Sequence, residues 1–356
     1  MQARLAGEVD GRLEALLRAV AERNGSDLLF APGVPPTARV DGALVPLETA
    51  PLLPDETAAL ARTLAGERWS ELQSRREIDF SFAFGETARI RANLFFQRGT
   101  LAGALRLVPY EIPSLEALGA PAVCAELVGR PNGLILVTGP TGAGKSTTLA
   151  AMVDRVNRER AVNVITIEDP IEYVHRHRRS IVVQREVGSD TLDFARALRA
   201  ALRENPDVVQ VGEMRDLETI AAVLTLAETG HLVLATLHTN DTAQAVDRIV
   251  DVFPPGQQRQ VRIQLSQTLL AILHQVLLPR RDEGGRVAAF EVMLATPAIR
   301  NLIKEGKTNQ LRNVIQTGAA AGMRTLEADL RRLIHEGLVD PADAATATLH
   351  PEELAV

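Results

Sequence analysis

The chain has 356 residues, which is too long for one ordinary domain and fits two or three. Apolar residues make up 46 % of it, ample for sizeable cores, and the net charge of −6 disfavours a protein that lives on bulk nucleic acid or anionic lipid. Cys124 is the only cysteine, so the chain forms neither an intramolecular disulfide nor a Cys-x-x-Cys metal site, in agreement with a reducing compartment.

The N-terminal third predicts an α+β domain, because helical spacing and two-residue alternation of apolar residues occur in turn. We expect one domain over 1–108. Pro109, Pro113 and Pro121 punctuate the next segment, so 109–120 is interpreted as a linker. The expected elements are helices at 13–23 and 55–73 and strands at 28–30, 38–47 (turning at Asp41-Gly42), 78–84, 88–96 and 103–108.

From residue 121 onward, short apolar strands alternate with helices, which predicts a mostly parallel sheet covered on both faces. We expect this core to span 121–280. Beyond Pro255 the chain is expected to be largely helical with one strand at 287–292, so 281–356 is assigned to a mainly helical C-terminal region. The expected core elements are strands at 134–138, 162–167, 207–211 and 232–237 and helices at 147–157, 192–203, 221–228 and 243–252.

A phosphate-binding loop stands between the first of these strands and its helix. Residues 139–146 satisfy G-x-x-x-x-G-K-[ST], whose glycines let backbone N–H groups point at phosphate oxygens while the helix N-terminus faces the same anion. Lys145 is expected to reach the β and γ phosphates and the Ser146 hydroxyl to ligate Mg²⁺. A chance glycine-rich turn is the alternative. The candidate nucleotide-binding residues are Gly139, Pro140, Thr141, Gly142, Ala143, Gly144, Lys145, Ser146 and Thr147.

Carboxylates follow two of the predicted strands. Glu168 and Asp169 end one strand, and Glu213 ends another. Ligands of such sheets bind beyond the carboxyl ends of strands, where a carboxylate positions Mg²⁺ or orients an attacking water. Glu168 and Glu213 are therefore candidate catalytic acids. The alternative is that an acid here only caps the next helix, as Asp169 before Pro170 would.

Histidines and arginines supply further candidates. His231 and His238 flank the strand at 232–237. A lone histidine is usually a core or cap residue, but the position of His238 beside a third strand end favours contact with the γ-phosphate or with the acid on a neighbouring strand. An arginine that reaches across a subunit boundary stabilises transition-state charge. Most arginines are solvated, and the sequence does not choose among Arg91, Arg98, Arg106, Arg199 and Arg203.

The motifs together resemble the type II/IV secretion ATPase superfamily. The segments at 139–148, 166–175, 211–216 and 229–241 are similar to its Walker A loop, Asp box, Walker B segment and His box, and the resemblance covers nearly the whole chain. Two features favour its pilus-retraction subgroup. Residues 298–303 (Ala-Ile-Arg-Asn-Leu-Ile) resemble that subgroup's C-terminal motif, although an ordinary amphipathic helix explains them as well. A single cysteine also cannot build the tetracysteine zinc insert of many assembly and secretion members.

The resemblance implies a hexameric ring that hydrolyses ATP with Mg²⁺ and powers pilus retraction. Each chain would have a PAS-like N-terminal domain and a RecA-like core. Glu168 is then the implied water-activating acid, and Glu213 is linked to Mg²⁺ together with Ser146. His231 and His238 match the His box. The family's arginines match Arg91, Arg106, Arg199 and Arg203.

The implied partners are further copies of this chain, an inner-membrane platform protein and a paralogous retraction ATPase. No apolar run reaches about 18 residues, and the first residues lack the apolar core of a signal peptide. We therefore expect a cytoplasmic protein that lies at the inner face of the cytoplasmic membrane through its partners.

Other functions remain open at this point. A pilus-assembly or type II secretion motor, or an accessory ring subunit of low turnover, would carry the same motifs. A nucleic-acid motor is disfavoured by the net charge and the few aromatic residues. Gln210 is polar where an aliphatic residue is usual in the family, which either retunes hydrolysis or reflects a local partner. The basic run at 175–179 is a solvated loop or a contact for an acidic partner.

Overall fold

The computed structural model describes residues 11–23, 25–40, 42–85, 88–109, 111–282 and 284–354. It divides into two compact units, Met1–Glu111 and Ile112–Val356, whose boundary falls inside the segment interpreted as a linker. Leu115 is buried in the core of the second unit, and Glu116 accepts a 2.7 Å hydrogen bond from Arg155 of that unit. The second half of this segment therefore packs on the second unit.

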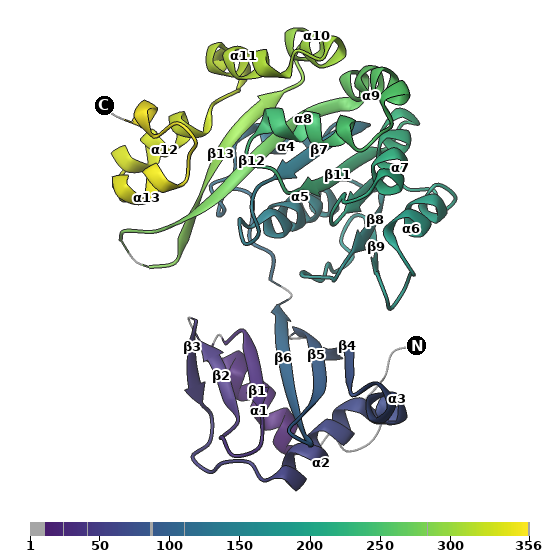
Figure 1. Ribbon diagram of the computed structural model, residues 1–356, viewed down its shortest axis with the longest axis vertical. Coiled ribbons are helices and arrows are strands. Elements are labelled where there is room, and N and C mark those ends of the chain that lie inside the picture. The colour runs from purple at the N-terminus through teal and green to yellow at the C-terminus, as the bar shows by residue number, and fades with distance from the viewer. Residues whose placement is uncertain are drawn as a thin grey trace. The chain divides into compact units, whose positions relative to one another are not determined.

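The N-terminal unit is an antiparallel sheet with helices on one face (Figure 1). The strand order is β3-β2-β1-β6-β5-β4. Leu13 and Leu17 of one helix and Leu60 and Leu72 of the next two share a core with the alternating buried residues of the strands. The bounds are α1 Gly11–Glu22, β1 Asp27–Phe30, β2 Thr37–Val40, β3 Ala43–Pro46, α2 Pro54–Ala65, α3 Trp69–Arg75, β4 Glu77–Phe84, β5 Ala88–Gln97 and β6 Thr100–Pro109.

The expected α+β character of this unit is confirmed, and each predicted helix and strand has a counterpart. The segment at 38–47 forms most of β2 and all of β3, and the chain turns at Gly42, whose φ of 82° is in the left-handed region that glycine tolerates. Asp41, the other residue of the predicted turn, lies outside the described residues.

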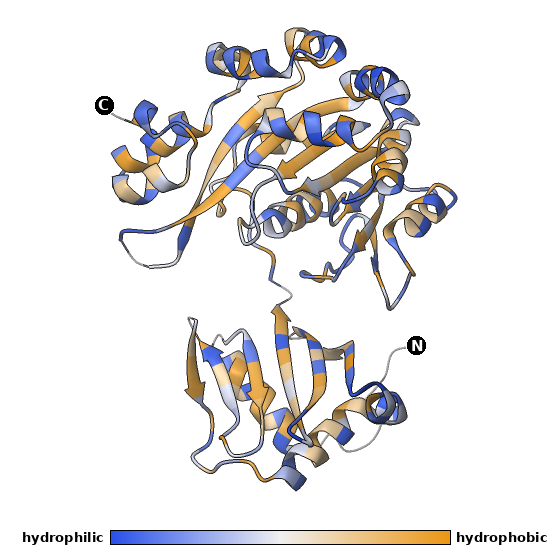
Figure 2. Cartoon of the chain, in the orientation of Figure 1, coloured by the Kyte–Doolittle hydropathy of each residue, from blue (hydrophilic) through white to orange (hydrophobic). Residues whose placement is uncertain are grey.

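The second unit is built on a seven-stranded sheet in the order β13-β12-β7-β11-β10-β8-β9, parallel except for the edge strand β13. β7 and β11 are buried along their whole length and hydrophobic, as Figure 2 shows, because helices cover both faces. The strand bounds are β7 Gly133–Thr138, β8 Asn163–Glu168, β9 Ile181–Glu186, β10 Val208–Val211, β11 Leu232–Leu237, β12 Leu269–Pro279 and β13 Arg286–Leu294.

Two cores hold the helices to this sheet. α4 and α5 pack on one face, and α6 to α11 pack on the other. α12 and α13 lie against the outer part of the β12–β13 hairpin, where Val276, Leu278 and Ala289 are buried (Figure 1). The helix bounds are α4 Val123–Leu127, α5 Lys145–Glu159, α6 Phe194–Ala201, α7 Leu217–Glu228, α8 Thr242–Asp251, α9 Pro255–Thr268, α10 Pro297–Glu305, α11 Leu311–Thr317, α12 Leu326–His335 and α13 Pro341–Thr346.

The expected order of strands and helices in this unit is confirmed, with two corrections. Beyond Pro255 the chain is largely helical and the expected strand at 287–292 is present as β13, but the expectation of one strand there is wrong, because β12 occupies 269–279. Its residues lack alternation since both faces are buried, and a continuous apolar run does not distinguish a strand from a buried helix. β9 was also not predicted. Among the described residues, no helix has the length and apolar character needed to span a membrane.

Candidate nucleotide site

The loop between β7 and α5 requires its glycines. Gly139, Gly142 and Gly144 have φ values of 146°, 80° and 85°. A Cβ on Gly139 would lie 2.2 Å from the carbonyl oxygen of Gln275 on β12, so only glycine fits there. The expected loop between strand and helix is thus present. Its Gly139 packs against β12, a strand that was not predicted.

The N-terminus of α5 is left open for an anion. Asp193, Asp216 and Asp241 cap α6, α7 and α8, each accepting a backbone N–H through its side chain. The residue at the same position of α5 is Gly144, and no side chain caps that helix. The N–H groups and the positive end of the helix dipole therefore face the loop, as a phosphate requires.

Lys145 lies inside the loop. Its Nζ donates hydrogen bonds to the carbonyl oxygens of Gly139 (3.0 Å) and Pro140 (2.9 Å), and its side chain is buried. Burial lowers the pKa of Lys145, while Glu213 and Glu172 act in the opposite direction. The ammonium group is thus held by neutral carbonyl oxygens at the place where an anionic ligand of the loop would lie.

A cavity of about 260 Å³ adjoins the loop and is lined by residues at the ends of three parallel strands. Its lining includes Lys145 and Ser146 from α5, Glu168 from β8, Glu213 following β10, and His238 following β11. The structure therefore brings together the lysine, both acids and one of the two histidines that the sequence singled out. Parallel strands explain this, because their carboxyl ends meet at one edge of the sheet.

Glu168 is almost completely buried, with 7 % of its surface exposed. Its Oε1 accepts hydrogen bonds from Thr166 Oγ1 at 2.6 Å and from Gln184 Nε2 at 3.0 Å. Burial raises the pKa of Glu168 to about 7, because these donors offset only part of the desolvation. A carboxyl group with a pKa near neutral pH is suited to exchange a proton with water.

Glu213 is half-buried and carries two partners. Arg215 lies 2.7 Å from its Oε2, and His238 Nε2 lies 3.4 Å from its Oε1. Burial works to raise the pKa of Glu213, but Arg215, His238 and Lys145 outweigh it and hold that pKa below its usual value. Glu213 is therefore an anion at neutral pH, whereas Glu168 with its pKa of about 7 is only partly ionised there, and the two acids are suited to different tasks.

The residues predicted to bind magnesium lie at the same cavity. Ser146 and Glu213 both line it. No group of three or more His, Cys, Asp or Glu residues that could hold a metal occurs among the described residues. This donor set fits Mg²⁺, which takes one or two protein oxygens and completes its shell with water and substrate phosphates.

Several candidates lie away from the cavity. His231 is at the opposite end of β11, with Nδ1 2.9 Å from the carbonyl oxygen of Leu226. Arg199 on α6 pairs with Glu218 at 3.2 Å, and Arg203 follows that helix with its side chain exposed.

The two N-terminal arginines occupy neighbouring strands of the other unit. Arg91 on β5 lies opposite Arg106 on β6, and Arg106 Nε is 2.9 Å from Asp27 Oδ1.

No helix follows Asp169 directly, so the alternative that Asp169 caps the next helix is wrong.

Three residues of the site escaped sequence reasoning. Arg215 contacts Glu213, Gln184 holds Glu168, and Gln275 Oε1 accepts a 2.7 Å hydrogen bond from Thr148 at the base of the loop. Arg215 stands two residues after Glu213, so this spacing could have identified it as a partner of Glu213. Gln184 and Gln275 lie on β9 and β12, the two strands that were not predicted.

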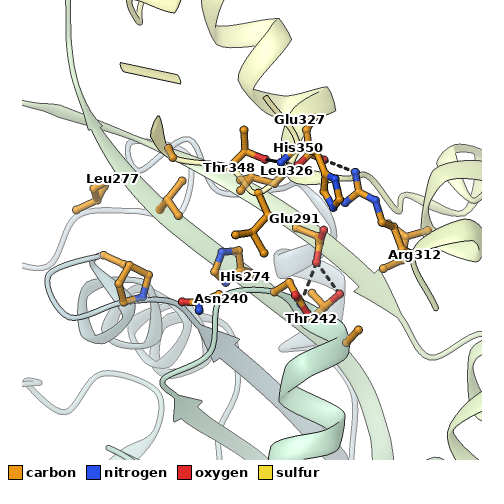
Figure 3. Close-up of a pocket in the computed structure, with 18 of the residues that line it drawn as sticks. Asn240, Thr242, His274, Leu277, Glu291, Arg312, Leu326, Glu327, Thr348 and His350 are labelled. Atoms are coloured by element: carbon orange, nitrogen blue, oxygen red, sulfur yellow. Dashed lines mark hydrogen bonds and ion pairs between the residues drawn. The ribbon is translucent and has the colours of Figure 1, made fainter. Parts of the chain in front are cut away.

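A larger cavity, of about 560 Å³, borders the same loop where the C-terminal helices meet the core (Figure 3). Pro140 and Ala143 line it together with Glu291, Arg312 and Glu327. Glu291 accepts hydrogen bonds from the backbone N (2.9 Å) and Oγ1 (2.6 Å) of Thr242 at the start of α8. Glu327 pairs with Arg312 at 3.0 Å and accepts a hydrogen bond from Thr348.

The loop, the parallel sheet and the two acids define a P-loop nucleotide-binding protein with a RecA-like core. The family model described as "Type II/IV secretion system protein" matches residues 110–346, and the chain belongs to this family. The expected resemblance to its pilus-retraction members is confirmed by the relatives that follow.

The type IV pilus retraction ATPase PilT of Pseudomonas aeruginosa is 46 % identical over 95 % of this chain and 98 % of its own length. A twitching motility protein of Neisseria gonorrhoeae is 45 % identical over 90 % of this chain and 86 % of its own. A solved structure of the pilus retraction motor PilT with bound ADP matches with a TM-score of 0.90 at 48 % identity, covering 96 % of this chain and 98 % of that one.

Proposed function

We propose that this chain is an ATP-hydrolysing motor subunit that powers type IV pilus retraction. The observation that carries this proposal is the convergence of Lys145, Glu168 and Glu213 on one cavity at the uncapped N-terminus of α5. The names of the two relatives and the ADP in the similar solved structure support the choice of nucleotide and of task.

The geometry of the site supports the following proposed roles. Loop N–H groups and Lys145 would hold the triphosphate, and Ser146 and Glu213 would hold Mg²⁺. Mg²⁺ would neutralise charge on the phosphates. Glu168 takes a proton from water as the water oxygen attacks the γ-phosphorus and the bond to the bridging β–γ oxygen breaks. The products are ADP and phosphate. His238, in contact with Glu213, is placed to respond to the γ-phosphate.

The remaining candidates are assigned to neighbouring subunits of a hexameric ring. Arg199 and Arg203 are outside the cavity of their own chain, and Arg91 and Arg106 belong to the other unit. We assign these arginines, with His231, to contacts across subunit boundaries, where a cation stabilises transition-state charge. The PAS-like domain at 1–108 and the core at 121–280 would then move as rigid bodies about the part of 109–120 that precedes Leu115, carrying the region at 281–356 with the core.

The cellular setting is part of the proposal. The ring would lie in the cytoplasm at the inner face of the membrane and push on a platform protein there. A paralogous retraction ATPase would be a second partner, and nucleic acid would not be one.

Two measurements test the function. Purified protein should hydrolyse ATP in the presence of Mg²⁺, and Lys145→Ala should remove nearly all of this activity because the lysine contacts phosphate.

A deletion strain should still form pili that no longer retract. Absence of pili would instead indicate an assembly motor, and a loss of protein secretion would indicate a type II secretion motor. A pure wild-type protein without turnover would indicate an accessory subunit.

A further inference from the structure

Gln210 is a buried amide in the middle of the ATPase sheet. It lies on β10 with only 4 % of its surface exposed. Val209 and Val211 on the same strand belong to the core under α6 and α7, whereas Val208 belongs to the core under α5. Because side chains alternate along a strand, Gln210 shares the α5 face with Val208.

The Oε1 atom of Gln210 has no hydrogen-bond partner among the described residues. Native structures rarely leave a buried carbonyl oxygen without a donor, and such an atom commonly meets a water or a ligand. Gln210 also lines the 260 Å³ cavity, together with Lys145, Glu168 and Glu213. The unpaired oxygen therefore belongs to a side chain at the proposed site of hydrolysis, and no group of the described chain satisfies it.

The register of the sheet places Gln210 in a row of polar side chains. Thr166 on β8 is directly opposite Gln184 on β9, and on its other side it is directly opposite Gln210 on β10. Thr166 and Gln184 both donate to Oε1 of Glu168, which is two residues beyond Thr166 on the same face. Gln210 thus flanks Thr166 as Gln184 does, but its carbonyl oxygen has no donor in the part of the chain that the structure describes.

We infer that Gln210 is a positioning residue that holds the attacking water beside Glu168, and this inference rests on the proposed ATPase function. One O–H of the water donates to Gln210 Oε1, and the other faces the Glu168 carboxylate. In the reaction the second proton passes to Glu168 while the water oxygen bonds to the γ-phosphorus and ADP leaves. Gln210 gains and loses no proton. A water in this place has the two polar partners that a buried water needs.

The test compares three variants of the full chain. Gln210→Leu and Gln210→Met both remove the acceptor, and methionine keeps the unbranched length of the side chain. Val208→Ala is the matched control, because it perturbs the same strand and the same face without lining the cavity. Steady-state kcat and KM for ATP with Mg²⁺ are measured for each variant, together with Tm.

Gln210→Leu and Gln210→Met should each lower kcat at least about tenfold with KM within about twofold, since general base catalysis with a positioned water contributes about 10²–10⁴-fold. Their Tm should be unchanged or higher, because a buried atom without a partner is removed. Val208→Ala should lower Tm and leave kcat within about twofold, since it removes only packing atoms.

A wild-type or faster kcat in both Gln210 variants would overturn the inference. So would a lower kcat that comes with a fall in Tm like that of Val208→Ala, because it would reveal a merely structural residue. These outcomes differ from a failure of the proposed function. That proposal fails if the wild type does not hydrolyse ATP, whereas the variants are read only against an active wild type.

Discussion

Two cavities border the loop at 139–144, and their charged groups are balanced in different ways. In the larger cavity, Glu327 pairs with Arg312, and Glu291 accepts hydrogen bonds at the N-terminus of α8. In the smaller one, Glu168 accepts hydrogen bonds from the neutral groups of Thr166 and Gln184, and Lys145 rests on carbonyl oxygens. Each cavity also contains an ion pair, Glu213 with Arg215 in the smaller and Glu327 with Arg312 in the larger. What marks the smaller cavity as a ligand site is therefore Lys145, because neutral carbonyl oxygens hold its buried ammonium group where an anionic ligand would lie.

The largest effect is expected at Glu213. Glu213→Gln keeps the shape of the side chain but removes its charge, so we expect a loss in kcat of at least about 10³-fold, with the fold retained, because the charge on a metal-linked acid acts mainly in the transition state. The measurement is steady-state ATPase activity beside Tm. Glu228→Gln, at the exposed end of α7, is the matched control. Activity within tenfold of the wild type would remove Glu213 from the catalytic machinery.

Glu168 should give the next largest effect. Glu168→Gln should lower kcat by about 10²–10³-fold, since a glutamine cannot accept the proton of the attacking water. In the wild type kcat should rise with pH through about 7, the pKa to which burial raises Glu168, because only the ionised carboxylate acts as a base. A kcat that stays flat between pH 5.5 and 8.5 (about 1.5 units either side) would contradict this role.

The same carboxyl group should make stability depend on pH. Its pKa is about 7 in the folded chain against 4.5 as the ordinary value, so the folded state binds the proton more tightly than the unfolded state does. The stability that protonated Glu168 contributes is complete below pH 4.5 and is lost as pH rises to about 7. The loss amounts to about 3 kcal/mol. Urea unfolding of Glu168→Gln without nucleotide should lack this part of the pH dependence, and a curve parallel to the wild type would refute it.

The larger cavity should respond in the opposite way. Glu327 is 2 % exposed, and Glu327→Gln weakens its pairing with Arg312, so we expect a loss of about 1–3 kcal/mol in unfolding free energy. The ATPase rate of the folded protein should stay within about threefold, because the paired charges join α11 to α12, and both residues lie outside the smaller cavity. Urea unfolding measures the loss of stability, and ATPase assays measure the rate. Glu353→Gln, which changes the more exposed partner of Arg312, should cost less.

A catalytic loss in Glu327→Gln without a loss of stability would erase the distinction between the two cavities. It would mean that the larger cavity also acts on the nucleotide. We expect instead that substitutions in the smaller cavity lower mainly the ATPase rate, whereas Glu327→Gln in the larger cavity lowers mainly the stability.

Much of this site was predictable from local rules. The phosphate loop, the acids at strand ends and His238 follow from motif spacing and from the convergence of parallel strand ends. His231 shows the limit of that reasoning. The six residues of β11 separate His231 from His238, so the two histidines lie at opposite ends of the strand.

What escaped the sequence depends on register and on burial. Gln184 and Gln275 lie on strands whose residue patterns do not identify them as strands. Gln210 stood out as a polar residue in an apolar strand, but only the fold shows that it stands opposite Thr166 and that its Oε1 has no donor among the described residues. Cross-strand neighbours are set by the register of the whole sheet, which no single segment encodes.

The smallest effect on the isolated fold is expected at Arg199. It forms an exposed pair with Glu218, so Arg199→Ala should change unfolding free energy by less than about 0.5 kcal/mol. A fall in the ATPase rate of the assembled protein would then report a contact outside its own chain, since Arg199 does not line the cavity of that chain. Glu218→Gln breaks the same ion pair and keeps the arginine, so it should leave the rate unchanged. Equal losses in both variants would show that the ion pair itself is what matters, and Arg199 would then have no role across a subunit boundary.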